Sequence, residues 1–137
     1  MIDVIRLSNV KNNEKFNFVT TDEGEMIKYV RNCFLATKVS FYNEIYSFCK
    51  AKCVDYNRVI ELVVSDKRIG KSHSSVPGPD GHFGYGGTCF PKDMASLEYQ
   101  MKSVDVHPYI IEAANKRNNE VDRKEKDWSN DKGRAVV

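Results

Sequence analysis

Residues 21–52 contain no proline and only one glycine, Gly24, so nothing in this segment interrupts a single long helix. Thr21 and Asp22, followed by Glu25, supply the capping and acidic residues typical of a helix N-terminus. Its apolar side chains cover most of the helix circumference: Met26, Ile27, Val30, Phe34, Val39, Phe41, Ile45, Phe48 and Cys49. A helix that is apolar nearly all round must be buried on more than one side. We therefore predict an all-α dimerisation domain built on this central helix, paired with a second copy as a homodimer.

Shorter helices are expected on either side of a long loop. Asp55 is suited to cap a helix at about residues 56–64, and Pro91 suits the first position of another helix. A last helix is predicted at about residues 109–121. Residues 71–88 form a loop that contains the turn cluster Pro-Gly-Pro-Asp-Gly. A loop of this length inside a compact domain is usually functional, which makes it the first candidate to carry a site.

The chain divides into three parts. Residues 1–20 alternate apolar and polar positions and predict one or two short strands, the extended remnant of a missing N-terminal domain. Residues 21–121 are predicted to form the central helical dimerisation domain. Residues 122–137 mix both charges around one tryptophan, and we expect a charged tail that is frayed or disordered.

Composition argues against several classes of partner. The formal net charge is only +2 and no basic stripe is present, which argues against a nucleic-acid surface. No apolar run approaches the roughly 20 residues that a membrane-spanning helix needs. The N-terminus lacks the basic and apolar regions of a signal peptide, so a cytoplasmic protein without a membrane partner is expected.

The four cysteines match neither a zinc knuckle nor a C-x-x-C redox pair. No histidine pair completes a ligand set, so no metal site is predicted. Cys33, Cys49 and Cys53 fall within an apolar helical pattern and are predicted to be reduced core residues. Cys89 differs from them because glycines and charged residues surround it.

The stretch around Cys89, residues 84–93, reads Gly-Tyr-Gly-Gly-Thr-Cys-Phe-Pro-Lys-Asp. Its glycines allow positive φ and a close approach to a ligand. Cys89 is expected near a helix start, where free N–H groups and the dipole favour a thiolate. Lys92 adds a cation and Asp93 a carboxylate, and together they suggest a site of covalent catalysis. Two alternatives remain: a structural loop with Cys89 as a small buried residue, or a Cys–His hydrolase.

Lys28 and Asn32 lie four residues apart and so share one face of the long helix, with Asn43 close to the same face. Two polar side chains at such positions can belong to a solvated face. Here their flanks are apolar, which equally suggests two polar groups directed into a pocket. On the second interpretation, Lys28 and Asn32 should point towards Cys89.

Motifs in three segments resemble those of UDP-glucose 6-dehydrogenases, in the UDP-glucose/GDP-mannose dehydrogenase family. Residues 25–44 read E-M-I-K-Y-x-x-N-x-F-L-A-T-K-V-S-F-x-N-E, residues 66–70 read D-x-R-I-G, and residues 84–93 read G-Y-G-G-T-C-F-P-K-D. In order, they resemble the central domain of these enzymes. The C-F-P-K-D form is more similar to the UDP-glucose enzymes than to their GDP-mannose and N-acetylmannosamine relatives.

The resemblance implies a role for each matching residue. Cys89 would attack the C6 aldehyde formed by a first hydride transfer. A second hydride transfer from the thiohemiacetal would give a thioester, which water would hydrolyse to UDP-glucuronate. Lys28 and Asn32 would hold the C6 oxygen and stabilise its negative charge. Asp93 would position or activate water, and Lys92 would lie towards the cofactor, NAD.

The resemblance also implies a substrate site shared between subunits. Gly84, Tyr85 and Gly86 would line the sugar site, and Arg68 would reach the UDP-sugar of the neighbouring subunit. The sequence lacks the G-x-G-x-x-G turn with which such enzymes bind NAD. We therefore expect an enzyme part that needs a separate NAD-binding domain in trans and is inactive alone. The alternative is a non-catalytic dimerisation module left by gene truncation.

Overall fold

The computed structural model describes residues 17–130, and every regular element within them is a helix, with no strand. The predicted all-α class is therefore confirmed, whereas the strands expected in residues 1–20 lie almost entirely outside the described residues. The elements are α1 (Thr21–Ala51), α2 (Tyr56–Val63), α3 (Cys89–Ser103), α4 (Tyr109–Arg117), a π-helical turn (Asn118–Asp122) and a 3-10 turn (Asp127–Asn130). Within the described residues, no helix is both long and apolar enough to span a bilayer.

The long helix α1 begins one residue earlier than its sequence suggested. Its N-cap is Thr20, whose Oγ1 accepts the Glu23 N–H at 3.2 Å while Glu23 Oε2 accepts the Thr20 N–H at 2.8 Å. These reciprocal bonds form a capping box that satisfies two N–H groups at the helix start. With 31 residues, α1 is about 46 Å long at the α-helical rise.

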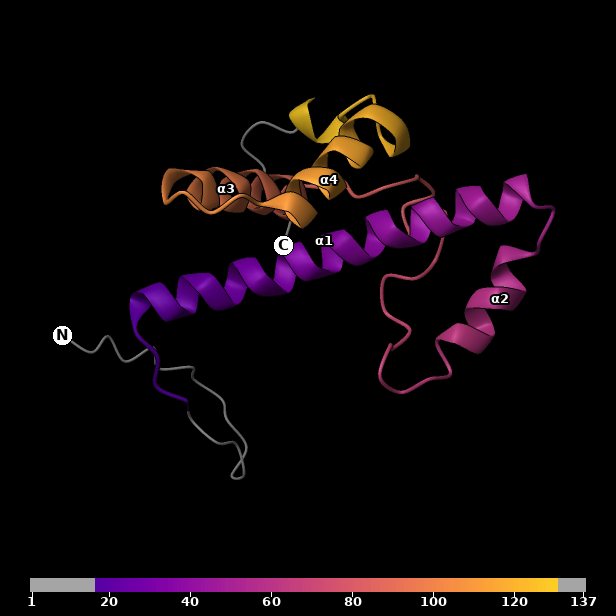
Figure 1. The fold of residues 1–137 in the computed structure, drawn as a ribbon, viewed down its shortest axis with the longest axis horizontal. Helices are drawn as coiled ribbons and strands as arrows, with labels where there is room; N and C mark the ends of the chain where they lie inside the picture. Colours follow the sequence, from indigo (N-terminus) through magenta and orange to yellow (C-terminus); the bar gives the residue numbers. More distant parts are fainter. Residues whose placement is uncertain (1–16, 131–137) are drawn as a thin grey trace.

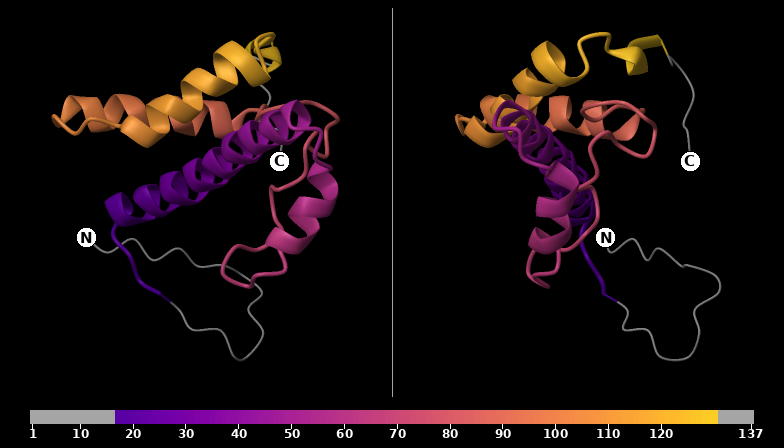
Figure 2. Two further views of the ribbon diagram at one scale, coloured as in Figure 1. Left: turned by 45° about the vertical axis from the view of Figure 1, so that its right-hand side comes forward. Right: turned by 90° about the vertical axis from the view of Figure 1, so that its right-hand side faces the viewer.

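Helix α1 is the axis on which the other elements are arranged (Figure 1). Helices α3 and α4 lie beside each other along one side of α1, and α2 lies at its C-terminal end on the opposite side (Figure 2). Residues 64–88 run from the end of α2 back across α1 to the start of α3. The loop that carries the glycine-rich stretch is thereby held between the two groups of helices.

Two apolar clusters hold these elements against α1. The first joins the middle of α1 to the loop, α3 and α4 through Cys33, Ala36, Tyr85, Met94 and Ala114. The second joins the end of α1 to α2 and the loop through Tyr42, Cys49, Tyr56, Ile60 and Val76.

Both clusters exclude Cys53, which we expected in the core. It is exposed because it follows the end of α1, where the chain turns with a φ of 56°.

A stripe of α1 stays exposed although its side chains are large and apolar. Ile27, Phe34, Phe41 and Phe48 recur every seven residues, which keeps them on one side of the helix. Their exposed fractions are 39%, 65%, 59% and 60%. We call these four residues the α1 stripe. Such a contiguous apolar surface is typical of a protein interface rather than of a solvated helix face.

Candidate functional site

Cys89 is the first residue of α3, and its side chain is exposed. The expected position near a helix start is thus observed, although Pro91 is the third helical residue rather than the first. Thr88 precedes the helix and places its Oγ1 3.9 Å from Cys89 Sγ. The thiol therefore faces solvent at the end of the helix where free N–H groups gather.

Asp93 lies one turn after Cys89 on α3 and is only 1% exposed. Its Oδ2 accepts a hydrogen bond from Asn32 Nδ2 of α1 at 2.6 Å, which joins the two helices beside the thiol. Its Oδ1 accepts no hydrogen bond from the described residues and lies 3.9 Å from Lys92 Nζ. Lys28 lies one turn before Asn32 and its side chain is exposed, outside the Asn32–Asp93 contact. The fold thus brings Asn32, Lys92 and Asp93 together near Cys89.

The glycine-rich loop before Cys89 is fixed by asparagines on two different elements. Gly84 is buried with a φ of 66°, and its N–H donates to Asn43 Oδ1 of α1 at 3.1 Å. Tyr85 exchanges two bonds with Asn118: its N–H donates to Oδ1 at 2.8 Å and its carbonyl accepts from Nδ2 at 2.9 Å. Asn118 is fully buried, so these bonds satisfy an amide that has no access to water.

The side chain of Tyr85 points into the first apolar cluster. Its hydroxyl donates to Asn115 Oδ1 at 2.6 Å, and burial raises the pKa of Tyr85 above its usual range. A residue expected to line the sugar site is thus held by its backbone and by its side chain. Its observed contacts anchor the loop.

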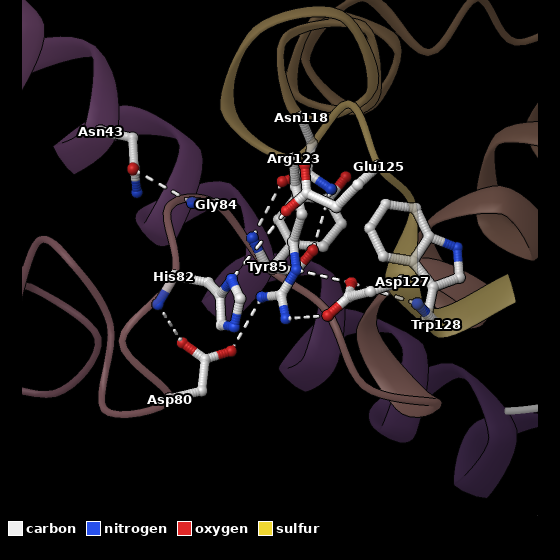
Figure 3. A network of polar contacts seen from close by, with 10 residues as sticks. All are labelled: Asn43, Asp80, His82, Gly84, Tyr85, Asn118, Arg123, Glu125, Asp127 and Trp128. Carbon is white, nitrogen blue, oxygen red and sulfur yellow. Dashed lines mark hydrogen bonds and ion pairs between the residues drawn. The ribbon is translucent and has the colours of Figure 1, made fainter. Parts of the chain in front are cut away.

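Arg123 lies at the centre of a network that sequence reasoning missed (Figure 3). Residues 122–137 were expected to form a tail, yet the part up to residue 130 folds into turns and Arg123 is only 3% exposed. Its guanidinium donates to Asp127 and also to Asp80, 43 residues earlier in the chain. A run of mixed charges gives no sign of such a distant partner, so Arg123 resembles an ordinary surface charge in the sequence.

Arg68 lies outside the contact between Asn32 and Asp93. Its side chain is 88% exposed and forms an ion pair with Asp66 at 2.6 Å. Together with Phe34 and Phe41 of the α1 stripe, Arg68 lines a shallow groove. Any contact of Arg68 with a sugar nucleotide would therefore occur beside the exposed apolar face of α1.

Comparison with known proteins identifies the group to which these features belong. Residues 22–120 match the central domain of the UDP-glucose/GDP-mannose dehydrogenase family. The chain belongs to this family. It is similar to the UDP-glucose 6-dehydrogenase of Pseudomonas aeruginosa, with 38% identity over 109 residues, which are 80% of this chain and 23% of that protein.

Other members of the family show similar identity. UDP-glucose 6-dehydrogenase TuaD of Bacillus subtilis is 40% identical over 92 residues, which are 67% of this chain and 19% of that protein. A GDP-mannose 6-dehydrogenase of Pseudomonas putida is 40% identical over 96 residues, which are 69% of this chain and 21% of that protein. The matched part therefore spans 19–23% of the length of these dehydrogenases.

Cysteine labelling tests the site of this dehydrogenase-family domain directly. Cys53 and Cys89 are exposed, so both should react with iodoacetamide at neutral pH. Cys33 and Cys49 are buried and should stay unmodified. Burial, and then the nearby charge of Asp93, raises the pKa of Cys33 to about 11, which further lowers its thiolate fraction. Peptide masses after a short reaction give the result, and modification of Cys33 at the rate of Cys53 would contradict the packing described here.

The ion pairs of Arg123 should make this dehydrogenase-family domain sensitive to acid. Hydrogen bonds from Arg123 lower the pKa of Asp127. Partial burial raises the pKa of Asp80, but hydrogen bonds from the His82 N–H and from Arg123 outweigh it, and the net shift is downward. The stability that both carboxylates contribute is therefore fully present above the unfolded pKa of about 4. It is lost as the pH falls through the lowered folded values.

The measurement is urea denaturation at a series of pH values from about 6 to about 3, across the unfolded pKa of aspartate. The free energy of unfolding should fall at the acid end, and Arg123→Met should reduce the slope of that fall. An unchanged slope in Arg123→Met would show that these pairs do not carry the acid sensitivity.

Proposed function

We propose that this domain supplies the nucleophile of a dehydrogenase that oxidises UDP-glucose to UDP-glucuronate in two NAD-dependent steps. The proposal rests on one observation: an exposed Cys89 lies one turn from a buried Asp93, whose carboxylate is held by Asn32 of the facing helix. Family membership supports it, because the relatives matched over most of this chain are sugar-nucleotide 6-dehydrogenases.

The described residues do not fit NAD as its main binding site. A dinucleotide fold needs a strand that leads through a glycine turn into a helix, and residues 17–130 contain no strand. Lys92, exposed beside Asp93, is the one residue here that we assign towards the cofactor. In this proposal a separate domain holds NAD, which acts as the electron acceptor for the oxidation of C6.

Cys89 would carry the covalent chemistry of this chain. Its thiol sulfur adds to the carbonyl carbon of a C6 aldehyde, and the carbonyl oxygen becomes the oxygen of a thiohemiacetal. After oxidation at the same carbon, the resulting thioester is cleaved by water, which releases the carboxylate and returns the thiol. Lys28 and Asn32 would stabilise the charge on the C6 oxygen, a role suited to an exposed ammonium and an amide.

Asp93 would position or activate the hydrolytic water. Its Oδ2 is engaged by Asn32, and Oδ1 keeps acceptor capacity beside Lys92. Gly84, Tyr85 and Gly86 would line the sugar site, and the buried side chain of Tyr85 would hold this backbone in place.

A homodimer is part of the same proposal. The α1 stripe leaves a large apolar surface that a second copy would cover, and Arg68 lies at its edge beside Phe34 and Phe41. A two-fold pair places the same surface of each copy on the other, so each Arg68 would lie beside the partner copy. This geometry favours the contact of Arg68 with the neighbouring UDP-sugar.

The test is NADH formation, measured by absorbance, with the chain alone and with an added NAD-binding domain from a relative. Activity only on mixing, lost in Cys89→Ala, is the expected result. Parallel assays with GDP-mannose decide the sugar nucleotide, since relatives of both kinds match at similar identity. NADH formed by the chain alone would contradict the assignment of NAD to a separate domain.

The alternative is a non-catalytic dimerisation module. The exposed α1 stripe favours it independently of Cys89, because it offers an interface without any chemistry. Dimerisation together with no NADH in either assay would support this alternative and reject the enzyme proposal.

A further inference from the structure

We propose that Arg123 is a positioning residue that clamps the loop leading into Cys89, so that the presentation of the thiol depends on a segment beyond α4. This inference rests on the proposed function only for its consequence in catalysis. The clamp itself is a statement about the loop and is tested without substrate or cofactor.

Arg123 is almost fully buried and uses each of its three nitrogen atoms (Figure 3). Nε and Nη2 donate to the two oxygens of Asp127 at 2.7 and 2.6 Å, a bidentate pair. Nη1 donates to Asp80 Oδ2 at 2.8 Å, and Asp80 lies in the long loop. Asp80 Oδ1 in turn accepts the His82 N–H at 3.0 Å, which fixes the turn at the loop's outer end. A planar guanidinium fits this arrangement because its donors form a rigid fork.

The guanidinium also lies against the loop backbone three residues before Cys89. A Cβ added to Gly86 would collide with the Arg123 guanidinium carbon and with both terminal nitrogens. Gly86 does not adopt a positive φ, so its lack of a side chain is explained by this close approach rather than by backbone conformation. The pair Gly86–Arg123 is therefore a steric fit between the loop and the clamp.

Three consecutive loop residues are thus held by three separate side chains. Asn43 of α1 holds Gly84, Asn118 holds both backbone groups of Tyr85, and Arg123 packs on Gly86. Two of these three side chains come from the segment that follows α4. Because Cys89 begins α3 directly after this loop, loosening the clamp should change how the thiol is presented.

A double-mutant cycle of Gly86→Ala and Arg123→Ala tests the steric fit. We expect Gly86→Ala to speed hydrogen exchange of the Gly84 and Tyr85 amides by at least about tenfold, because its Cβ displaces the guanidinium. In the Arg123→Ala background, the same change should speed exchange by less than about twofold, because the collision is gone. If the fold-changes in exchange rate of the two single variants simply multiply in the double variant, the clamp proposal is overturned.

The second readout is the rate of Cys89 alkylation relative to Cys53, an exposed thiol in the same molecule that follows the end of α1. We expect Gly86→Ala and Arg123→Ala to change this ratio by at least about threefold. Lys102→Met is the control, because Lys102 also forms ion pairs between elements, but with Glu98 and Glu112 instead of the loop or residues 118–130. The control should leave the alkylation ratio unchanged even if it lowers stability. An unchanged ratio in Arg123→Ala would overturn the proposal.

Arg123→Lys keeps the test decisive if Arg123→Ala fails to fold. Lysine retains the charge but loses the fork, so exchange and alkylation should move in the direction of Arg123→Ala. Wild-type behaviour of Arg123→Lys would overturn the clamp as described. Both readouts are independent of the enzyme proposal. Lack of activity in the mixing assay would reject that proposal and leave the clamp standing, whereas exchange effects that simply multiply would reject the clamp alone.

Discussion

Gly84→Ala should destabilise the domain by about 2–5 kcal/mol, the sum of a left-handed alanine and an overpacked interior. Gly84 has a φ of 66°, and an added Cβ would collide with Asn118 Oδ1 and lie 2.9 Å from Asp122 Cβ. Asn118 cannot easily move, because both ends of its amide are bonded to Tyr85. The free energy of unfolding from urea denaturation gives the result.

Gly81→Ala is the matched control. Gly81 has a similar φ of 79°, but an added Cβ would meet nothing within 4 Å. It should therefore cost only the conformational part, about 1–2 kcal/mol. Equal destabilisation by the two substitutions would show that the loop is not packed against Asn118 as described.

Phe41→Asp should weaken self-association about thirtyfold or more, the equivalent of about 2 kcal/mol at an interface hot spot. Phe41 is 59% exposed at the centre of the α1 stripe, where a charge would be buried in a two-fold contact. Sedimentation velocity over a range of concentrations gives the association constant.

Two controls separate the interface from general effects of exposed aromatic residues. Phe41→Leu keeps the surface apolar and should associate nearly as the wild type does. Tyr99→Asp removes an aromatic residue that is 76% exposed on α3, outside the stripe, and should have no effect. A wild-type chain that stays monomeric at tens of micromolar, roughly the range in which a stable dimer forms, would reject the proposed homodimer.

Local sequence signals predicted the helices well because their causes are local. The absence of helix breakers and the apolar pattern placed α1 almost to the residue. Asp55 does cap α2, accepting the N–H groups of Asn57 and Arg58. The contact between Asn32 and Asp93 joins residues 61 positions apart, and no local pattern predicted it.

Other features depend on the tertiary fold and left no local trace. Arg123 and Asn118 act on the loop from a stretch whose charges predict only solvent exposure. Cys53 was assigned to the core because the apolar pattern continued past the true end of α1. Burial there depends on where the chain turns, and periodicity alone does not reveal that point.

Helix α1 presents Asn32 to α3 on one side and the α1 stripe to solvent on another, and this makes its length intolerant of change. Inserting one residue between Phe34 and Phe41 would rotate everything after it by about 100°. Asn43 would then leave the glycine loop, and Phe41 and Phe48 would leave the line of Ile27 and Phe34. Insertions and deletions should therefore be excluded from this helix and fall instead in exposed connections such as residues 104–107, between α3 and α4.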